Sequence, residues 1–324
     1  MTLLQRVPSP PDFRLDFAAL DREYEWVRVL STCPQSPDWH AEGNVWIHTR
    51  MVLQSLIDLP AWRDLPEQDR AVVFLAALLH DVAKPECTRT EPDGRITSRG
   101  HSRRGAIYAR ELLWRMDIPF SLREAVCALV LHHQVPFSLI DRTDAERTAI
   151  TISQLVRCDL LSLVAEADAR GRECVDKARL LDNIGLYDEL CRELGCWQAP
   201  WPFRDDHARF LFFHEPARSR HAPAHDDTRC EVVVMSGLPG AGKDRYVAAH
   251  ESGRPVISLD AIREELDVDP TDSQSRVAQE ARDRAREFLR KEQSFVWNAT
   301  NLSQDMRARI IDLAYRLALG AATR

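Results

Sequence analysis

Long apolar segments are scarce in this sequence. The longest uninterrupted apolar run, Ala71 to Leu79, has nine residues, far fewer than the roughly 20 that a bilayer span requires. The N-terminal segment, MTLLQRVPSPPDF, lacks the apolar core of a secretory signal. We therefore expect a cytoplasmic protein without a membrane partner.

Paired cysteine motifs are absent as well. The chain has eight cysteines but no CxxC motif, and the closest two in sequence are Cys191 and Cys196. Widely spaced cysteines in a cytoplasmic protein usually stay reduced. We therefore expect free buried thiols and no structural zinc site.

Lysine is rare: only four of the 43 basic residues are lysine, and two of them, Lys84 and Lys243, lie inside motifs described below. The net charge is −7, and residues 229–324 carry 15 basic and 15 acidic side chains, so the acidic excess lies in the first 228 residues. Neither part has the basic excess of a broad nucleic-acid-binding surface.

The 324 residues divide by their sequence patterns into two parts. Helical periodicity runs through residues 1–196, as in 44–59, 69–84, 102–116 and 151–169. This predicts an N-terminal all-α domain over 1–196. Residues 197–229 contain four prolines and a charged end, which predicts a linker whose HARFLFF segment docks on a domain.

Strands and helices alternate from residue 230 onward. Apolar strand patterns occur at 231–236, 254–260 and 294–298, and helical patterns at 244–251, 276–292 and 303–319. This alternation is typical of a parallel sheet. The sequence thus predicts a multidomain protein, with an α/β domain of P-loop type over 230–324.

A His80-Asp81 doublet closes the apolar run of the first part. Burying an imidazole beside a carboxylate costs several kcal/mol unless they are paired or bind a metal, about 2 to 7 kcal/mol for each uncompensated polar group. A helix-terminal histidine with an exposed aspartate is the simpler alternative. Further polar residues in amphipathic segments favour the metal instead: His48, His101, His132, His133 and Asp168. Imidazole and carboxylate together suit a divalent Mn, Mg, Ni, Co, Fe or Zn ion.

This order of residues resembles that of the HD-domain metal-dependent phosphohydrolases. The segments HAEGNVWIHT, ALLHDVAKP, GHSRRGA, LVLHH and ADARGR resemble the HD domain of bacterial tRNA nucleotidyltransferases. The resemblance covers about residues 40–172. It implies that His48, His80, Asp81 and Asp168 are metal ligands, and that His101 and His133 bind a second metal or the substrate phosphate.

Other residues near these motifs have less specific interpretations. Lys84 follows the doublet by one turn and either binds a substrate phosphate or stabilises a helix C-terminus. His132 and Cys87 are expected to be ordinary core or surface residues. The sequence assigns no role to His40 or to the histidines at 207, 214, 221 and 225.

The stretch GLPGAGKD, residues 237–244, has the pattern of a phosphate-binding loop between a strand and a helix. Gly237, Gly240 and Gly242 would let backbone N–H groups converge on the β-phosphate of Mg-ATP, and Lys243 would reach its β and γ oxygens. Asp244 stands where a hydroxyl residue usually holds magnesium.

Polar residues follow the other two predicted strands. Asp260 lies at the carboxyl end of the second strand, where open α/β sheets bind ligands, and Arg263 comes one helical turn later. Asn298 and Asn301 follow the third strand. A carboxylate here can accept the proton of an attacking hydroxyl, and an arginine can hold a phosphate; an N-cap aspartate with a surface arginine is the alternative.

The segments GLPGAGKD, SLDAIR and NATN resemble the kinase module of polynucleotide 5′-kinases. With the preceding motifs, nearly the whole chain resembles the bacterial HD-domain polynucleotide kinases, which heal RNA ends. This resemblance implies that the helical domain removes a 2′- or 3′-terminal phosphate or opens a 2′,3′-cyclic phosphate. It also implies that the α/β domain phosphorylates a 5′-OH, with Asp260 as general base and Arg263 contacting the acceptor phosphate.

The sequence departs from that family after the third strand. The fourth strand and the arginine-bearing lid of such kinases find no counterpart before residue 324. We therefore expect weak nucleotide binding and poor phosphorylation. Two alternatives stay open: a phosphohydrolase of free nucleotides whose P-loop part senses ATP, and a non-catalytic nucleotide-binding subunit of a repair complex. RNA or DNA ends and a nucleoside triphosphate are the expected partners of the leading hypothesis.

Overall fold

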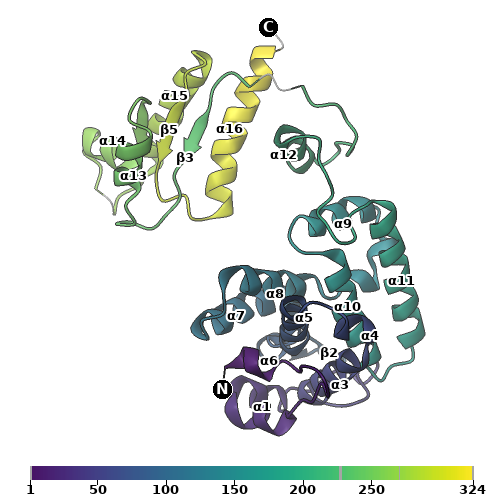
Figure 1. The fold of residues 1–324 in the computed structure, drawn as a ribbon. Coiled ribbons are helices and arrows are strands. Elements are labelled where there is room, and N and C mark those ends of the chain that lie inside the picture. The colour runs from purple at the N-terminus through teal and green to yellow at the C-terminus, as the bar shows by residue number, and fades with distance from the viewer. Residues whose placement is uncertain (1, 226–227, 270, 323–324) are drawn as a thin grey trace. The chain divides into compact units, whose positions relative to one another are not determined.

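The computed structural model describes residues 2–225, 228–269 and 271–322 (Figure 1). It divides into two compact units, Met1–His221 and Ala222–Arg324. Each unit is built around its own hydrophobic core.

The first unit is helical, as predicted from the periodicity. Its helices are, in chain order, η1 (Leu3–Arg6), α1 (Phe17–Glu23), α2 (Glu25–Leu30), α3 (Val45–Asp58), α4 (Pro60–Arg63), α5 (Glu67–Leu79), α6 (Lys84–Cys87), α7 (His101–Arg115), α8 (Phe120–His132), η2 (Val135–Phe137), η3 (Leu139–Asp141), α9 (Ala145–Ser153), α10 (Cys158–Arg170), α11 (Lys177–Glu193) and α12 (Asp206–His214). A small antiparallel hairpin, β1 (Arg89–Thr90) with β2 (Ile96–Thr97), was not predicted, since strands of two residues are too short to show alternation.

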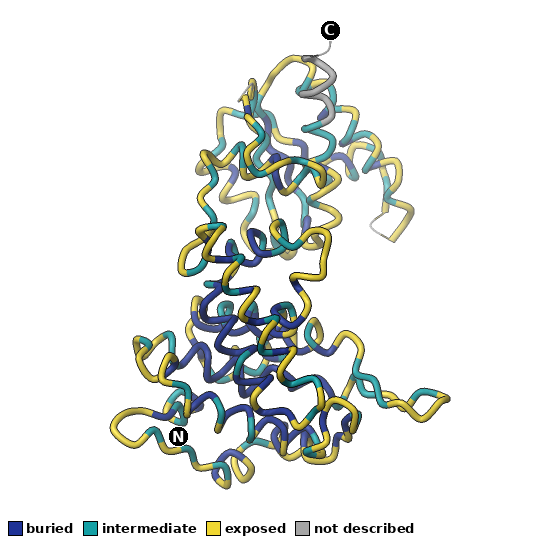
Figure 2. The backbone as a smooth tube through the Cα atoms, turned by 90° about the vertical axis from the view of Figure 1, so that its right-hand side faces the viewer, coloured by how far each residue is buried: buried dark blue, intermediate teal, exposed yellow. Residues whose placement is uncertain are grey.

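Helix α5 lies at the centre of this unit. All its residues from Ala71 to Leu79 are buried, and α3, α8 and α10 pack against it. The buried backbone accordingly concentrates in this unit's interior (Figure 2). Because α5 ends at Leu79, its packing carries His80 and Asp81 into the interior between the surrounding helices.

The periodic segment 151–169 is not one helix. It is interrupted between Ser153 and Cys158, where α9 and α10 meet with a bend of 109°. Arg157 adopts an extended conformation there. Within the described residues no single helix is long and apolar enough to cross a bilayer, and only this bent pair meets that criterion together.

Part of the segment predicted to be a linker, 197–229, packs on the helical unit. The HARFLFF stretch lies within helix α12, which buries Leu211 and Phe212. Arg147 of α9 donates to the carbonyl oxygen of Phe212 and lies over its ring, 4.1 Å from the centroid. The backbone N–H of Trp201 donates to Ser153 Oγ at 3.0 Å. Residues up to His221 therefore group with the first unit, and the domain bounds at 196 and 230 stay a prediction.

The second unit is the expected α/β fold. Strands β3 (Val232–Val234), β5 (Phe295–Asn298) and β4 (Val256–Ser258) form a parallel sheet in that order, with Val233 opposite Val296 and Ile257 opposite Trp297. Its helices are α13 (Lys243–His250), α14 (Leu259–Glu265), α15 (Ser275–Arg290) and α16 (Gln304–Ala322). Residues 270, 323 and 324 of the predicted domain lie outside the described residues.

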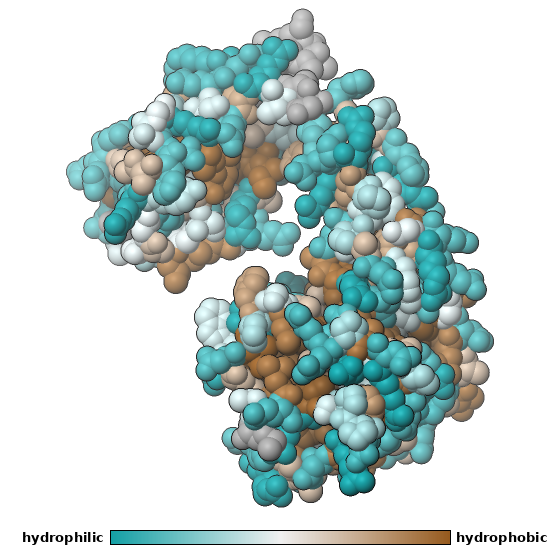
Figure 3. Space-filling model, viewed as in Figure 1, coloured by the Kyte–Doolittle hydropathy of each residue, from teal (hydrophilic) through white to brown (hydrophobic). Residues whose placement is uncertain are grey.

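The central strand of this sheet is β5. All four of its residues are buried, whereas β3 is half-buried and is an edge strand among the described residues. Since the strands are parallel, the phosphate loop after β3, Asp260 after β4 and Asn298, the last residue of β5, lie at the same edge of the sheet. On the face seen in Figure 3, each unit also exposes some hydrophobic surface among hydrophilic side chains, as folded proteins generally do.

Candidate metal centre and phosphate loop

Residues from five helices or helix ends converge in the first unit. His48 comes from α3, His80 and Asp81 follow α5, and Asp168 lies near the end of α10. His101 begins α7 and His133 ends α8. We call these six residues the His/Asp cluster. All six, which are far apart in sequence, are buried.

The four imidazoles of the His/Asp cluster share one orientation. The Nδ1 atoms of His80, His101 and His133 lie 2.7, 2.8 and 2.7 Å from the carbonyl oxygens of Ala77, Ser98 and Val130, respectively. Nδ1 of His48 lies 2.9 Å from Glu42 Oε1. When each ring carries a single proton, Nδ1 donates it to an oxygen and Nε2 presents a lone pair to the cluster.

These Nε2 atoms face one another and the carboxylates. His48 and His80 have their Nε2 atoms 3.2 Å apart, and those of His101 and His133 are 3.4 Å apart. Around one ion with metal–ligand bonds of about 2.1 Å, neighbouring ligand atoms lie about 3.0 to 3.4 Å apart. Two lone pairs at this distance repel unless a proton or a metal ion lies between them, and the spacing of the donor atoms fits a divalent metal.

Asp81 connects two groups of ligands. Its Oδ2 lies 3.1 Å from His80 Nε2, and its Oδ1 lies 3.2 Å from His101 Nε2. On one side, His48, His80 and Asp168 can share an ion, and on the other side Asp81, His101 and His133 can. Neither carboxylate oxygen of Asp81 accepts a hydrogen bond of good geometry, although both are buried. With one oxygen directed to each group of possible ligands, Asp81 could take part in both groups, while Lys84 neutralises part of its charge at Oδ2.

The electrostatics of the cluster favour an added cation. Burial opposes ionisation of Asp81, but the charges of His80 and Lys84 hold its pKa well below the usual range. Burial also disfavours a charged His80, yet Asp81 and Asp168 raise the pKa of its imidazole. Burial lowers the pKa of His133 to about 3, which keeps its ring neutral and able to bind a metal at neutral pH.

Asp168 and Lys84 both have charged partners. Arg172 donates from Nε and Nη2 to the two oxygens of Asp168, at 2.8 and 2.7 Å. The Nζ of Lys84 lies 2.7 Å from Asp81 Oδ2 and donates to Gln35 Oε1 at 2.7 Å. Lys84 is therefore buried inside the site and pairs with the doublet.

The sequence did not reveal Glu42, Arg172 and His40. The oxygen Oε1 of Glu42 accepts from Nδ1 of both His40 and His48, at 2.8 and 2.9 Å. His40, to which the sequence assigned no role, therefore lies beside the cluster. Glu42 precedes its helix and carries no periodic signal. The spacing of four residues between Asp168 and Arg172 is typical of ion pairs within a helix, so the sequence could have predicted this ion pair.

The phosphate loop of the second unit is built mainly from backbone. Gly240 and Gly242 have φ of 76° and 84°, a left-handed conformation that only glycine adopts readily. Lys243, at the start of α13, donates from Nζ to the carbonyl oxygens of Gly237 and Leu238 at 3.2 and 3.0 Å. The lysine thus lies back over the loop, in reach of an anion that the loop amides could bind.

Hydrogen bonds connect the phosphate loop and the segment before it to the end of β5 and the segment after it. The amide of Asn298 donates to Asp244 Oδ1 at 2.6 Å, and the amide of Asn301 donates to the carbonyl oxygen of Met235 at 2.7 Å. Asp244, which stands where the motif usually has Ser or Thr, is therefore paired with Asn298. Asn301 is buried and supports the loop from behind.

Asp260 and Arg263 form an ion pair one turn apart on α14, with Nη1 and Oδ1 2.5 Å apart. The Asp260 side chain is 83% exposed, so it lies open to solvent beside Arg263. Ser258, and not Asp260, is the N-cap of this helix; the N-cap alternative for the aspartate is therefore wrong.

A third group of polar side chains was not expected. Cys158, Cys191 and Cys196 are all fully buried, and their sulfur atoms lie within 4.8 Å of one another. Their spacing of 33 and five residues has no motif that sequence inspection could recognise. All eight cysteines are free thiols in the structure, but the expectation that they are buried holds for five of them: Cys87, Cys174 and Cys230 are half-buried.

Comparisons with known proteins agree with both halves of the fold. Residues 45–170 match the model of the HD domain, and residues 232–322 match the model of an AAA domain. The chain therefore contains an HD domain followed by a P-loop domain, two types of domain found in enzymes.

Curated relatives include a tRNA nucleotidyltransferase and several multifunctional CCA proteins. The chain is 33% identical over 152 residues to the CC-adding tRNA nucleotidyltransferase of Thermus thermophilus, which covers 46% of this chain and 32% of the relative. It is 31% identical over 166 residues to the multifunctional CCA protein of Ralstonia nicotianae, covering 48% and 35%. The chain thus spans about a third of the length of these relatives.

Proposed function

We propose that this chain is an RNA end-healing enzyme. Its HD domain would remove a 2′- or 3′-terminal phosphate or open a 2′,3′-cyclic phosphate, and its P-loop domain would phosphorylate a 5′-OH end from a nucleoside triphosphate. The observation that carries the proposal is the His/Asp cluster: four buried Nε2 lone pairs and two buried carboxylates directed at one another. The similarity of the chain to a CC-adding tRNA nucleotidyltransferase favours RNA as the substrate.

The His/Asp cluster would hold one or two divalent ions. Such an ion supplies Lewis acidity toward a phosphate ester and lowers the pKa of water. The residues of the chain keep the ligands in place: Glu42 holds the ring of His48 through Nδ1, and Arg172 holds both oxygens of Asp168. Mn²⁺, Ni²⁺, Co²⁺, Fe²⁺ and Mg²⁺ all suit ligands of this type.

The exposure of individual residues suggests the side from which substrate approaches. His48, His80, Asp168 and His133 are 0% exposed, whereas His101 and Lys84 retain 6% and 5%. A phosphate would therefore approach past His101 and Lys84. There Lys84 can bind a phosphate oxygen while it stays paired with Asp81, and His101 can orient the phosphate from the opposite group of ligands.

The P-loop half of the proposal rests on fewer constraints. Lys243 and the loop amides would bind the β- and γ-phosphates of Mg-ATP, with Asp244 near the magnesium. Asp260 would accept the proton of the 5′-OH while the hydroxyl oxygen bonds to the γ-phosphoryl group and ADP leaves. Arg263 would hold the phosphate that follows the acceptor nucleotide. Weak nucleotide binding and poor phosphorylation stay predictions.

Substrate length separates this proposal from hydrolysis of free nucleotides. The full chain, loaded with Mn²⁺ or Ni²⁺, is incubated with oligoribonucleotides ending in a 3′-phosphate or a 2′,3′-cyclic phosphate, and in parallel with 2′-AMP and 3′-AMP. We expect faster release from, or opening of, the oligonucleotide ends. Turnover of mononucleotides alone would replace end healing by a nucleotide phosphohydrolase, and no turnover with any metal would support a non-catalytic nucleotide-binding subunit.

A further inference from the structure

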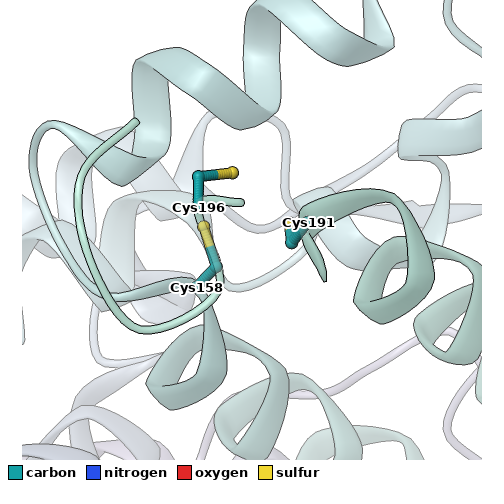
Figure 4. Close-up of side chains that lie close together, drawn as sticks. All are labelled: Cys158, Cys191 and Cys196. Atoms are coloured by element: carbon teal, nitrogen blue, oxygen red, sulfur yellow. The ribbon is translucent and has the colours of Figure 1, made fainter. Parts of the chain in front are cut away.

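The three-cysteine group joins parts of the chain that are separate in sequence. Cys158 is the first residue of α10, Cys191 lies in the last turn of α11, and Cys196 lies in the loop that follows α11 (Figure 4). Each has 0% exposure, and each pair of sulfur atoms is no more than 4.8 Å apart. This group is separate from the His/Asp cluster and shares no residue with it.

The local backbone brings Cys196 back toward Cys191. Gly195 has a φ of 71°, and this left-handed residue ends α11. The backbone N–H of Cys196 then donates to the carbonyl oxygen of Cys191 at 2.9 Å. The turn therefore places the sulfurs of Cys191 and Cys196 beside that of Cys158, the first residue of α10.

We propose that Cys158, Cys191 and Cys196 bind one thiophilic d¹⁰ metal ion, Zn²⁺ or Cu⁺. Soft thiolate ligands select these ions. Zinc–sulfur bonds of about 2.3 Å place tetrahedral ligands about 3.8 Å apart, so shifts of less than about 1 Å would bring the sulfurs to bonding distance. Binding displaces thiol protons to the solvent.

The surroundings of the three sulfurs fit such a site. Tyr187, also 0% exposed, donates from its hydroxyl to the carbonyl oxygen of Cys158 at 3.4 Å and closes one side. Among the described residues no His, Asp or Glu belongs to the group. All three protein ligands are therefore sulfur atoms, which favour a soft metal ion.

A metal here would fasten the chain beyond residue 196 to the helical unit. The carbonyl oxygen of Trp197, next to Cys196, accepts from the backbone N–H of Asp159 at 3.0 Å. Further along, the backbone N–H of Trp201 donates a hydrogen bond to Ser153 Oγ. The ion would thus join the ends of α10 and α11 at the start of the segment that carries α12.

Titration with Cd²⁺ tests the site in the full-length protein. The chain is reduced, freed of metal and titrated while ultraviolet absorption from thiolate-to-metal charge transfer is recorded. The nitrogen and oxygen ligands of the His/Asp cluster give no such band, so its metal does not interfere. We expect a band that saturates at one Cd²⁺ per chain beyond the Cd²⁺ taken up by the His/Asp cluster, with competition by Zn²⁺ and by Cu⁺ in separate arms identifying the tighter ion.

Single substitutions assign the band to these thiols. Cys158→Ser, Cys191→Ser and Cys196→Ser should each lose it, whereas Cys127→Ser should keep it, since Cys127 is equally buried but belongs to no such group. Absence of the band in the unsubstituted chain would overturn the proposal, and so would its persistence in all three variants. A metal-free chain isolated with a disulfide among these cysteines, and no band after reduction, would also overturn it.

Discussion

The two proposed sites are built from different materials. The His/Asp cluster consists of side chains, and His48, His80 and Asp168 have no exposed surface. The phosphate loop consists mainly of backbone shaped by Gly240 and Gly242, and the carboxylate assigned as its base, Asp260, is 83% exposed. The first site is enclosed by a helical core, whereas the second lies at the open edge of a small sheet.

This difference decides how much each site reveals without its ligand. Buried carboxylates and facing lone pairs cost free energy unless a cation compensates them, so the His/Asp cluster itself indicates what it binds. Exposed loop amides are solvated by water and cost little when no anion is bound. The cluster should therefore fail when any one ligand is removed, and the loop should weaken gradually.

The largest expected effect comes from the doublet. His80→Ala or Asp81→Ala should lower phosphate release by at least about 1000-fold, because the loss of metal removes several kcal/mol of transition-state stabilisation. His132→Ala is the matched control, since this histidine is adjacent to His133 but outside the cluster. Release is measured with a terminally phosphorylated oligonucleotide, and full activity in both doublet variants would refute the metal assignment.

A packing change should damage the same site without touching a ligand. A Cβ on Gly171 would lie 2.6 Å from the backbone nitrogen of Val52, so Gly171→Ala must push α3 away from α10. We expect the free energy of unfolding to fall by about 3 kcal/mol. The thermal midpoint should then be lower by about 6 to 12 °C, and metal binding should be weaker.

Gly185→Ala provides the control for that variant. Gly185 lies in α11 with no atom near its would-be Cβ, so alanine should raise stability by up to about 1 kcal/mol. Equal midpoints for the two variants would show that α3 and α10 are not in the close contact described.

The phosphate loop should respond to one lysine. Lys243→Ala removes a charged donor worth about 1.5 to 3 kcal/mol, so ATP affinity by calorimetry should fall about 10- to 100-fold while phosphate release stays unchanged. Lys291→Ala, which removes an exposed lysine paired with Glu287 in the same unit, should leave both properties intact. Micromolar ATP affinity with robust 5′-phosphate transfer in the unsubstituted chain would contradict the expectation of a weak kinase.

The smallest effect concerns Glu42, a positioning residue. Glu42→Gln weakens the acceptor that holds His48, so metal affinity should fall about 10- to 100-fold, and excess metal should restore the rate. Glu86→Gln is the control, because Glu86 pairs only with the exposed Arg104. If excess Mn²⁺ fails to restore activity, Glu42 does more than position the ring.

The sequence predicted elements whose signal is local and periodic. The apolar run before His80 predicted a buried helix, and the glycine-rich loop predicted a strand-to-helix turn, and both are present. It did not predict Glu42 beside His48, because only the tertiary fold brings a loop residue to that ring. The meeting of Cys158 with Cys191 depends in the same way on how α10 packs against α11, which no short-range spacing encodes.

The most direct test of the metal-dependent site is phosphate release before and after removal of metal. The full chain and its Lys243→Ala variant are treated with a chelator, assayed on a 2′,3′-cyclic-phosphate oligoribonucleotide together with a 3′-phosphorylated one, and assayed again after Mn²⁺ is returned. We predict that both proteins lose activity on chelation and regain it with Mn²⁺. Activity that persists in the chelated protein, or that disappears with Lys243→Ala, would contradict a metal site in the His/Asp cluster that works independently of the phosphate loop.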